Sequence, residues 1–365
     1  MRIVHILEFN QFNTGSVHQM FQAAAGLRAR GHDVTVVSRP DALLERRCRE
    51  HDVVFTGMPL RNQFDLRSMR ALSRLIGPRD VVHVHKGVSH ALALAATWLH
   101  PPGAFVVNRG VSFPLDFWNR GKFRTRRVDR IVTVCEQIRG VVIASGKLPP
   151  DKVTVVYAGT DVQRFDPARW PRDPFRRELA VPEDAFLIGQ AGVRDWKGWK
   201  ELVDAAAEFS HAHVALIGCR DERERAAVRD YARSRGTSGR VTSVEVRDDM
   251  PNVFAACDLV VDASWAGTGI TGTIREAMAM EKPVIATDCG GNAELVSSPE
   301  VGWLIPKRNH AALTRAIGEV IADPVRAAGV GRQARVHVVR SFSMEIRIDK
   351  LERLYGEILT AHGAG

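Results

Sequence analysis

Two basic residues follow an apolar run early in the second half of the chain. Arg194 and Lys197 lie in the stretch Gly192-Val-Arg-Asp-Trp-Lys-Gly, directly after the expected strand Phe186–Ala191. An arginine can bind a phosphate through two parallel hydrogen bonds, and a lysine adds a compact point charge. Together these properties make Arg194 and Lys197 candidates for binding a phosphate group of a ligand. The alternative is a solvated basic loop.

A glycine-rich turn follows another apolar run. Leu259–Asp262 predicts a buried strand, and a helix is expected to begin near Thr273, with Glu276 close to its start. The free N–H groups and positive dipole end of a helix start bind phosphate, and glycines let the phosphate approach the backbone. Glu276 could bind a ligand or simply complement the dipole. The candidate binding residues of the turn are Thr268, Gly269, Ile270, Thr271, Gly272 and Thr273.

The same turn contains the spacing G-x-G-x-x-G, formed by Gly267, Gly269 and Gly272. Asp288 lies 21 residues after Gly267, at the end of the next expected strand, where an acidic residue binds the ribose of a dinucleotide. This pattern is typical of nicotinamide- or flavin-dependent oxidoreductases. It normally follows the first strand of a domain, whereas here it comes late in the second half of the chain. An NAD-type oxidoreductase is therefore kept as an alternative function.

The elements that must position these residues alternate between strands and helices. Residues 1–160 contain a helical pattern at Val17–Arg30, which ends at Gly31, between apolar runs. Such alternation predicts an α/β fold with a parallel sheet covered by helices on both faces. The strands expected in this half are Ile3–Leu7, Val34–Ser38, Val53–Thr56, Val81–His85, Phe105–Asn108 and Ile131–Val134.

The alternation pauses and then restarts. Asp161–Asp184 holds four prolines among charged residues and is typical of a linker or of the start of a domain. Residues 161–343 then predict a second doubly wound domain, and a last helix is expected at Met344–Leu359. Two such domains facing each other would bind ligands in the cleft between them. The strands expected here are Phe186–Ala191, His213–Ile217, Val241–Val244, Leu259–Asp262 and Pro283–Thr287.

Composition limits the class of protein. Apolar residues make up 45% and charged residues 25% of the 365 residues, as in an ordinary globular protein, and no apolar run is long enough to span a membrane. The five cysteines lack C-x-x-C spacing, which favours a reducing cytoplasm and no structural zinc. The net charge of +9 favours anionic partners. We expect a cytoplasmic protein, with peripheral binding to the inner face of the cytoplasmic membrane as a further option.

A basic segment interleaved with aromatic residues lies in the first half, from Phe117 to Arg130. A solvated face is the ordinary explanation, and docking on anionic lipid is the functional one. Nucleic acid is disfavoured because no recognised nucleic-acid motif is present. A second candidate helix in this half carries the basic residues Arg61, Arg67, Arg70 and Arg74.

Taken together, several stretches resemble the retaining family 4 glycosyltransferases (group 1 glycosyl transferases) of the GT-B fold. In the second half they are the run from Ser264 through Glu276-Ala-Met-Ala, Lys282-Pro-Val-Ile-Ala-Thr, Gly290-Gly-Asn-Ala-Glu-Leu-Val and Gly302-Trp-Leu-Ile-Pro. In the first half Gly15-Ser16 stands where the family has a glycine pair. The resemblance covers nearly the whole chain.

The resemblance implies a role for each candidate. Arg194 and Lys197 would bind the diphosphate of the donor, with Gly15 and Ser16 also at the donor. Glu276 matches the second glutamate of the family's Glu-x7-Glu motif, which holds the ribose hydroxyls. Thr268 stands in place of the first glutamate, which usually contacts the donor sugar. Glu294 either touches the donor or caps a helix.

Two further residues are candidates near the reacting sugar. His83 and His85 end a buried strand, and we expect alternation to put them on opposite faces, one pointing into the cleft and the other into the core. His85 is the better site candidate. Arg109 stands about where many family members have a histidine. An arginine cannot act as a base near neutral pH, so Arg109 would instead bind phosphate or an anionic acceptor.

The implied fold is two Rossmann-like domains: residues 1–160 for the acceptor, with helix 344–365 packing back on them, and residues 161–343 for the donor. The implied reaction moves a sugar, with retention and without metal or cofactor, from a UDP-, GDP- or ADP-linked donor to a glycan or lipid-linked acceptor. The stretch Arg109–Pro114 hints at lipopolysaccharide core or another cell-surface glycan. A non-catalytic sugar-nucleotide-binding protein and an epimerase are further alternatives. A glycoside hydrolase is disfavoured because no pair of carboxylates faces one cleft.

Overall fold

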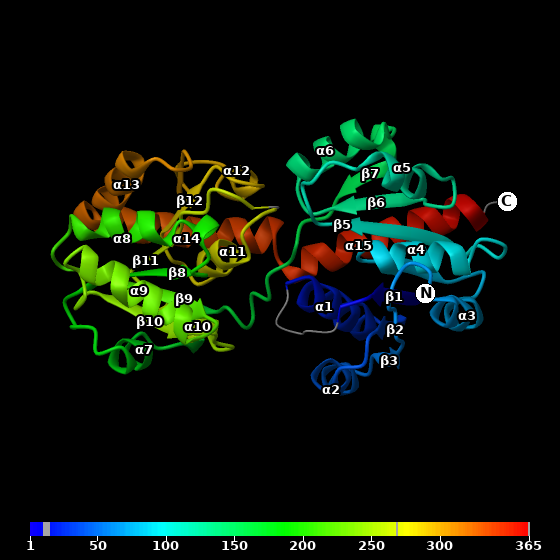
Figure 1. Ribbon diagram of the computed structural model, residues 1–365, viewed down its shortest axis with the longest axis horizontal. Coiled ribbons are helices and arrows are strands. Elements are labelled where there is room, and N and C mark those ends of the chain that lie inside the picture. Colours follow the sequence, from blue (N-terminus) through cyan, green and yellow to red (C-terminus); the bar gives the residue numbers. More distant parts are fainter. Residues whose placement is uncertain (10–14, 268, 364–365) are drawn as a thin grey trace. The chain divides into compact units, whose positions relative to one another are not determined.

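The computed structural model describes residues 1–9, 15–267 and 269–363. The chain forms two compact units (Figure 1). The N-terminal unit contains Met1–Gly159 together with Met344–Gly365, and the C-terminal unit contains Thr160–Ser343. The C-terminal helix thus belongs to the same unit as the start of the chain.

The N-terminal unit is built on a seven-stranded parallel sheet with the order β3-β2-β1-β4-β5-β6-β7. Its inner strands are buried, which explains why they are continuous apolar runs rather than alternating ones. The strands are β1 Arg2–Leu7, β2 Asp33–Ser38, β3 Val54–Gly57, β4 Val81–Val84, β5 Ala104–Arg109, β6 Arg130–Thr133 and β7 Val153–Val155.

Helices cover this sheet. Three of them begin at an aspartate whose carboxylate accepts a backbone N–H of the first turn: Asp41, Asp65 and Asp116. The helices are α1 Gly15–Ala29, α2 Ala42–Glu50, α3 Leu66–Leu75, α4 Gly87–Ala96, α5 Phe117–Arg124, α6 Glu136–Gly146 and α15 Met344–Gly363, with a short 3-10 turn, η1, at Pro150–Lys152.

Helices α1 and α15 pack against each other in the core of the N-terminal unit. Tyr355, Leu351 and Ile358 of α15 are buried in the same cluster as Leu27 of α1. Gly26 lies where α1 passes Ile348, and a Cβ on Gly26 would overlap that side chain. The last helix is therefore part of the N-terminal core.

The C-terminal unit has a six-stranded parallel sheet with the order β10-β9-β8-β11-β12-β13. The strands are β8 Phe186–Ala191, β9 Ala212–Cys219, β10 Val241–Glu245, β11 Leu259–Asp262, β12 Val284–Thr287 and β13 Trp303–Ile305. The helices are α7 Asp173–Glu178, α8 Trp199–Ala207, α9 Glu222–Ser234, α10 Met250–Ala256, α11 Gly272–Ala279, α12 Asn292–Leu295, α13 His310–Ala322 and α14 Pro324–Ser341, with the 3-10 turns η2 Pro167–Arg169 and η3 Asp195–Lys197.

The predicted α/β class with two parallel sheets is confirmed. Two strands, β7 and β13, were not predicted from the sequence; each has three residues and lies at a sheet edge. The proline-rich segment Asp161–Asp184 belongs to the C-terminal unit and contains η2 and α7.

Candidate functional site

The strand order of the C-terminal sheet reverses between β8 and β11. Doubly wound sheets bind ligands at such a switch point, outside the carboxyl ends of the strands. Lys197 follows β8, and Asp262 is the last residue of β11. The Lys197 Nζ lies 3.4 Å from the Asp262 carboxylate. The predicted phosphate-binding lysine is therefore at the switch point.

The backbone after β8 holds Lys197 there. Gln190, which is fully buried, donates a hydrogen bond to the Lys197 carbonyl at 3.0 Å. Gly198 has a φ of +66°, and a Cβ at this position would overlap the Ala263 carbonyl. Only a glycine lets the start of α8 pass so close to the end of β11. The Trp265 N–H donates to the Trp196 carbonyl at 2.9 Å, which joins the two turns a second time.

Asp262 links Lys197 to the glycine-rich turn. Its buried carboxylate accepts hydrogen bonds from the hydroxyl groups of Ser264, at 2.6 Å, and Thr271, at 2.7 Å. Asn292 donates to the same carboxylate at 3.3 Å and accepts the Thr271 N–H at 3.0 Å. Lys197 and Thr271 thus share one carboxylate, which places the lysine close to the start of α11.

The turn itself leads into α11. Gly290 has a φ of +60°, and a Cβ there would overlap the backbone of Gly269, so the chain after β12 packs tightly against the turn. Thr271 is the N-cap residue of α11, but its side chain makes no capping hydrogen bond because its hydroxyl is bound to Asp262. The start of α11 therefore offers backbone N–H groups to an anion.

Glu276 lies in α11 and is half-buried. Burial raises the pKa of its carboxyl to about 7, although the positive charges of Arg275 and Arg164 act in the opposite direction. Arg275, the residue before it, is buried, and its Nε donates to the hydroxyl of Thr160 at 2.6 Å. A glutamate with a raised pKa in the second turn of α11 fits a ligand-binding role.

Arg194 is exposed on the turn after β8. Its carbonyl accepts the Lys197 N–H at 2.8 Å, and its side chain lies in the field of Glu224, whose pKa it helps to lower. No contact that the structure describes joins its guanidinium to the Gly269–Thr273 turn. Its role at the diphosphate stays a prediction.

Sequence reasoning missed several residues of this site. Asp262 was assigned only as the end of a strand, although an acidic residue closing an apolar run is a signal of a buried polar role. Trp265 was also missed, and the Arg308 guanidinium lies 4.0 Å from the centre of its ring. An aromatic ring and a cation together at the edge of the turn could contact a base or a sugar.

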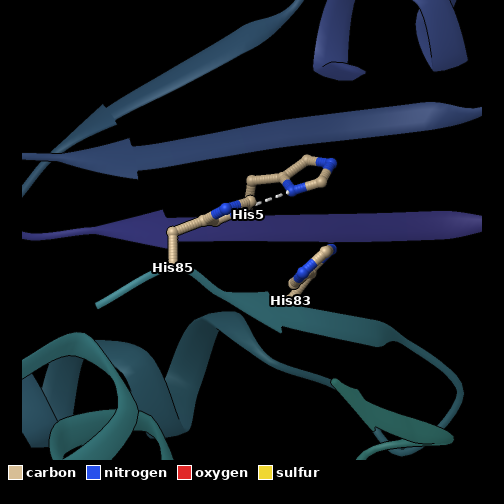
Figure 2. Close-up of side chains that lie close together, drawn as sticks. All are labelled: His5, His83 and His85. Atoms are coloured by element: carbon tan, nitrogen blue, oxygen red, sulfur yellow. Dashed lines mark hydrogen bonds between the residues drawn. The ribbon is translucent and has the colours of Figure 1, made fainter. Parts of the chain in front are cut away.

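In the N-terminal unit, the prediction that His83 and His85 point to opposite faces is wrong. Residues two apart in a strand share a face, and the two rings stack with their centres 4.4 Å apart. His5 of β1 joins them, and its Nδ1 lies 2.9 Å from the His85 Nε2 (Figure 2). All three rings are buried, so neither histidine is exposed at the surface. The predicted role of His85 is not tested by this geometry.

This histidine cluster, His5, His83 and His85, is the group of described side chains close enough to share a metal ion, with one ligand atom of each within 4.8 Å of the others. One observation opposes a cation there. The positive charge of Arg347 lowers the pKa of all three rings, after the larger effect of burial.

The remaining predicted residues lie in different places. Arg109 ends β5, is half-buried and donates to the Phe113 carbonyl at 2.7 Å. Gly15 and Ser16 begin α1 of the N-terminal unit. Glu294 lies in the short helix α12, which follows the tight turn at Gly290. Thr268 lies outside the described residues.

Two family models match successive parts of the chain. The model described as Glycosyltransferase Family 4 matches residues 14–164, and the model described as Glycosyl transferases group 1 matches residues 183–323. The chain belongs to the group 1, family 4 glycosyltransferases. The resemblance found in the sequence is confirmed.

Two curated relatives and one solved structure show what this glycosyltransferase is similar to. It is 29% identical to the D-inositol 3-phosphate glycosyltransferase of Salinispora tropica over 64% of this chain, spanning about half (52%) of that relative's length. It is 29% identical to the lipopolysaccharide core biosynthesis mannosyltransferase LpcC of Rhizobium leguminosarum, over 65% of this chain and 67% of the relative. Anabaena HepE in complex with UDP superposes with a TM-score of 0.86 at 19% identity, over 98% of this chain and 100% of that chain, and shows the GT-B fold.

Among the described residues, none of the helices combines the length and the apolar character needed to cross a bilayer.

Proposed function

We propose that this protein transfers a sugar, with retention of anomeric configuration, from a nucleotide-sugar donor to a hydroxyl group of an acceptor. The acceptor is a cell-surface glycan, a lipopolysaccharide core or a lipid-linked sugar. The observation that carries the proposal is that Lys197 and the hydroxyl of Thr271 meet on the Asp262 carboxylate. This contact brings a cation and a helix start to the same switch point.

The C-terminal unit would bind the donor. Lys197 and the N–H groups of the Gly269–Thr273 turn would bind the diphosphate, Arg194 would add a second cation, and Glu276 would accept hydrogen bonds from the ribose hydroxyls. The UDP complex of Anabaena HepE, which shares the fold, supports a nucleotide ligand. UDP, GDP and ADP donors all fit this proposal.

For the donor, the proposed sugar transfer requires stabilisation of the leaving diphosphate more than transfer of a proton. As the glycosidic bond breaks, negative charge develops on the leaving diphosphate. A fixed cation and backbone N–H groups stabilise that charge without reorganising. The Lys197 ammonium is held by Asp262, so its position does not depend on the ligand. No metal and no cofactor are part of the proposal.

An oxidoreductase is disfavoured by the position of its motif. The G-x-G-x-x-G turn follows β11, the fourth strand of the C-terminal unit in chain order, rather than the first strand β8. In a dinucleotide-binding domain the motif follows the first strand. Both family models are also glycosyltransferase models.

The acceptor side supports peripheral binding to anionic lipid at the inner face of the cytoplasmic membrane. Phe117 and Trp118 of α5 are 74% and 89% exposed, and Phe113 just before them is 67% exposed. Basic residues follow on the same segment, 117–130. Exposed aromatic rings beside cations fit the interface of an anionic bilayer. Flotation with phosphatidylglycerol vesicles should decrease in Trp118→Ser; unchanged flotation would exclude this surface.

Donor turnover tests the proposed function. We expect Lys197→Ala and Glu276→Ala to lower the hydrolysis or transfer of a nucleotide sugar by about 10²-fold or more, the usual cost of removing such stabilisation. Lys200→Ala is the matched control, because Lys200 is a nearby exposed lysine whose ion pair is with exposed Asp195 rather than with Asp262. Wild-type rates in both site variants, with folded protein by circular dichroism, would refute the assignment.

A further inference from the structure

The N-terminal sheet has its own switch point, between β1 and β4, where the strand order reverses. Glu8 directly follows β1, Lys86 lies just after β4, and Arg109 ends the neighbouring strand β5. Ligands of doubly wound sheets bind outside the carboxyl ends of these strands. The chemistry of this edge therefore indicates what the N-terminal unit binds.

Arg109 has hydrogen-bonding capacity that the protein does not use. Its Nη2 donates to the Phe113 carbonyl, but its Nε is buried and has no hydrogen-bond partner among the described residues. A guanidinium has five N–H donors in a planar fork, and a buried donor without an acceptor costs stability. An acceptor that approaches this side of the guanidinium would remove that cost.

Lys122 of α5 is a second half-buried cation at the same edge. Its Nζ donates a hydrogen bond of 3.4 Å to the carbonyl of Gly87, the first residue of α4. Burial lowers the pKa of Lys122 and repulsion from Arg109 lowers it further, while the charges of Asp116 and Glu8 act in the opposite direction. Burial also lowers the pKa of Arg109, against the effect of Asp116. Two like charges thus lie near each other where water screens them poorly.

The nearby carboxylates are already engaged. Glu8 accepts the backbone N–H groups of Val88 and Ser89, at 3.1 Å each, and so satisfies the start of α4. Asp116 caps α5 by accepting the Asn119 N–H. Within the part of the chain that the structure describes, neither Arg109 nor Lys122 has a carboxylate oxygen within the 4.0 Å of an ion pair.

We propose that Arg109 and Lys122 bind an oxyanion of the acceptor, so that the acceptor substrate of this enzyme is a phosphorylated molecule. This inference rests on the proposed function, which assigns the acceptor to the N-terminal unit. The guanidinium binds two oxygens of one anion through its fork, and the ammonium adds a point charge. The accepting hydroxyl is then oriented by a charged group of the same molecule, which restricts its approach to the donor sugar.

The oxyanion could belong to a soluble sugar phosphate or to the headgroup of a lipid. Both present the same chemistry to Arg109 and Lys122. The measurements therefore need one soluble probe and one membrane probe. The proposed phosphate site of the donor must also be weakened by mutation, so that the probes do not bind there.

The test uses the full-length Lys197→Ala protein, in which the proposed donor phosphate site is disabled. Glycerol 3-phosphate is titrated by calorimetry, and vesicles of phosphatidylcholine with and without phosphatidic acid are tested by flotation. We expect Arg109→Gln and Lys122→Gln, each added to this background, to weaken one or both interactions by at least about 10-fold, the effect of losing a charged hydrogen bond. Loss of glycerol 3-phosphate binding alone assigns a soluble acceptor. Loss of binding to phosphatidic acid vesicles, with or without loss of glycerol 3-phosphate binding, assigns a lipid.

Arg79→Gln is the matched control, because Arg79 is an exposed arginine of the same unit. Arg109→Lys should keep part of the affinity and checks that the site is folded. If neither substitution changes the binding of either probe, or if Lys197→Ala binds neither, the inference is overturned. Failure of the proposed function looks different, because the wild-type protein would then turn over no nucleotide sugar, whatever its affinity for glycerol 3-phosphate.

Discussion

At the scale of single residues, the position of Asp262 decides how the donor site is organised. Its carboxylate contacts Lys197, Ser264, Thr271 and Asn292, which come from three segments of the chain. A lysine near a diphosphate would otherwise be a mobile charge on a flexible stem. Asp262 therefore acts as a positioning residue for the proposed catalytic lysine.

Asp262→Asn should lower turnover by about 10²-fold, because the amide is uncharged and no longer holds the ammonium, and it has one acceptor oxygen where the carboxylate uses two. Small misplacements of the lysine are costly in catalysis. The measurement is kcat and KM for the nucleotide sugar, with the loss expected mainly in kcat. Asp288→Asn is the control, since Asp288 is an exposed aspartate after the adjacent strand β12. If Asp288→Asn lowered kcat as much as Asp262→Asn does, the result would contradict the positioning role of Asp262. It would favour the binding of a dinucleotide instead.

Glu276 predicts a pH dependence of donor binding. Its pKa is raised to about 7 by burial, so the carboxylate that accepts the ribose hydroxyls forms only as the pH rises through 7. Affinity for a nucleotide sugar, whose diphosphate diester does not titrate in this range, should therefore increase about 10-fold from pH 6 to pH 8, in proportion to the ionised fraction. Calorimetry at several pH values measures it. Glu276→Gln should bind weakly at every pH, whereas the control Glu294→Gln should keep the pH dependence.

Sequence spacing located Lys197 and Glu276 because both belong to local motifs. It could not show the contact between Lys197 and Asp262, which are 65 residues apart, because the order of strands in a sheet is not a local property. The same limit applies to Arg109 and Lys122: each was visible as a basic residue, but their common burial depends on how β5 and α5 pack.

At the scale of elements, the histidine cluster joins β1 and β4 to the C-terminal helix. His5 and His83 are opposite each other in the paired strands, and His83 is hydrogen-bonded to Tyr355 of α15. Arg347, also on α15, is the charged group that faces the cluster. The packing of α15 therefore depends on three imidazoles that remain neutral.

Acid should destabilise the N-terminal unit through this cluster. The pKa of His5 is lowered from 6.5 to about 3, chiefly by burial, so the unfolded chain binds a proton that the folded protein does not. Stability is then full above pH 6.5 and is lost as the pH falls toward 3, with a cost of about 2 kcal/mol at pH 5 for this one histidine. Urea unfolding at pH 5 and pH 8 measures the difference.

His5→Gln should be less stable than the wild type at pH 8 and should show a smaller loss between pH 8 and pH 5. The control is His100→Gln, a substitution of an exposed histidine in the same unit, which should leave both values unchanged. If His5→Gln lost as much unfolding free energy between pH 8 and pH 5 as the wild type, other groups would be the cause of the acid sensitivity.

Most elements could be predicted, and the exceptions have a common cause. Long buried strands such as β8 and β9 are continuous apolar runs. The edge strands β7 and β13 have three residues each, too few for a pattern to be distinguished from a loop. The error at His83 and His85 was one of strand geometry, because their separation of two residues already places them on one face.

At the scale of the whole molecule, each of the two units carries a switch point, and each switch point presents cations. Lys197 lies at the one in the C-terminal unit, and Arg109 lies beside the one in the N-terminal unit. Part of the net charge of +9 therefore comes from cations at the two proposed anion-binding sites rather than from a general basic surface. A donor and an acceptor that both carry oxyanions would each stabilise a different unit.

Thermal unfolding should therefore separate the two ligands. A ligand that binds only the folded state at 100 times its Kd adds about 2.7 kcal/mol to stability. We expect the cognate nucleoside diphosphate among UDP, GDP and ADP to raise the Tm at which residues 160–343 unfold, as followed by hydrogen exchange, and Lys197→Ala to remove the shift. Glycerol 3-phosphate, if it is bound at Arg109 and Lys122, should instead raise the Tm of the N-terminal unit in the wild type and in Lys197→Ala alike. NAD(H) should shift neither transition, and a shift by NAD(H) that exceeds those of all three diphosphates would replace the glycosyltransferase proposal with an oxidoreductase.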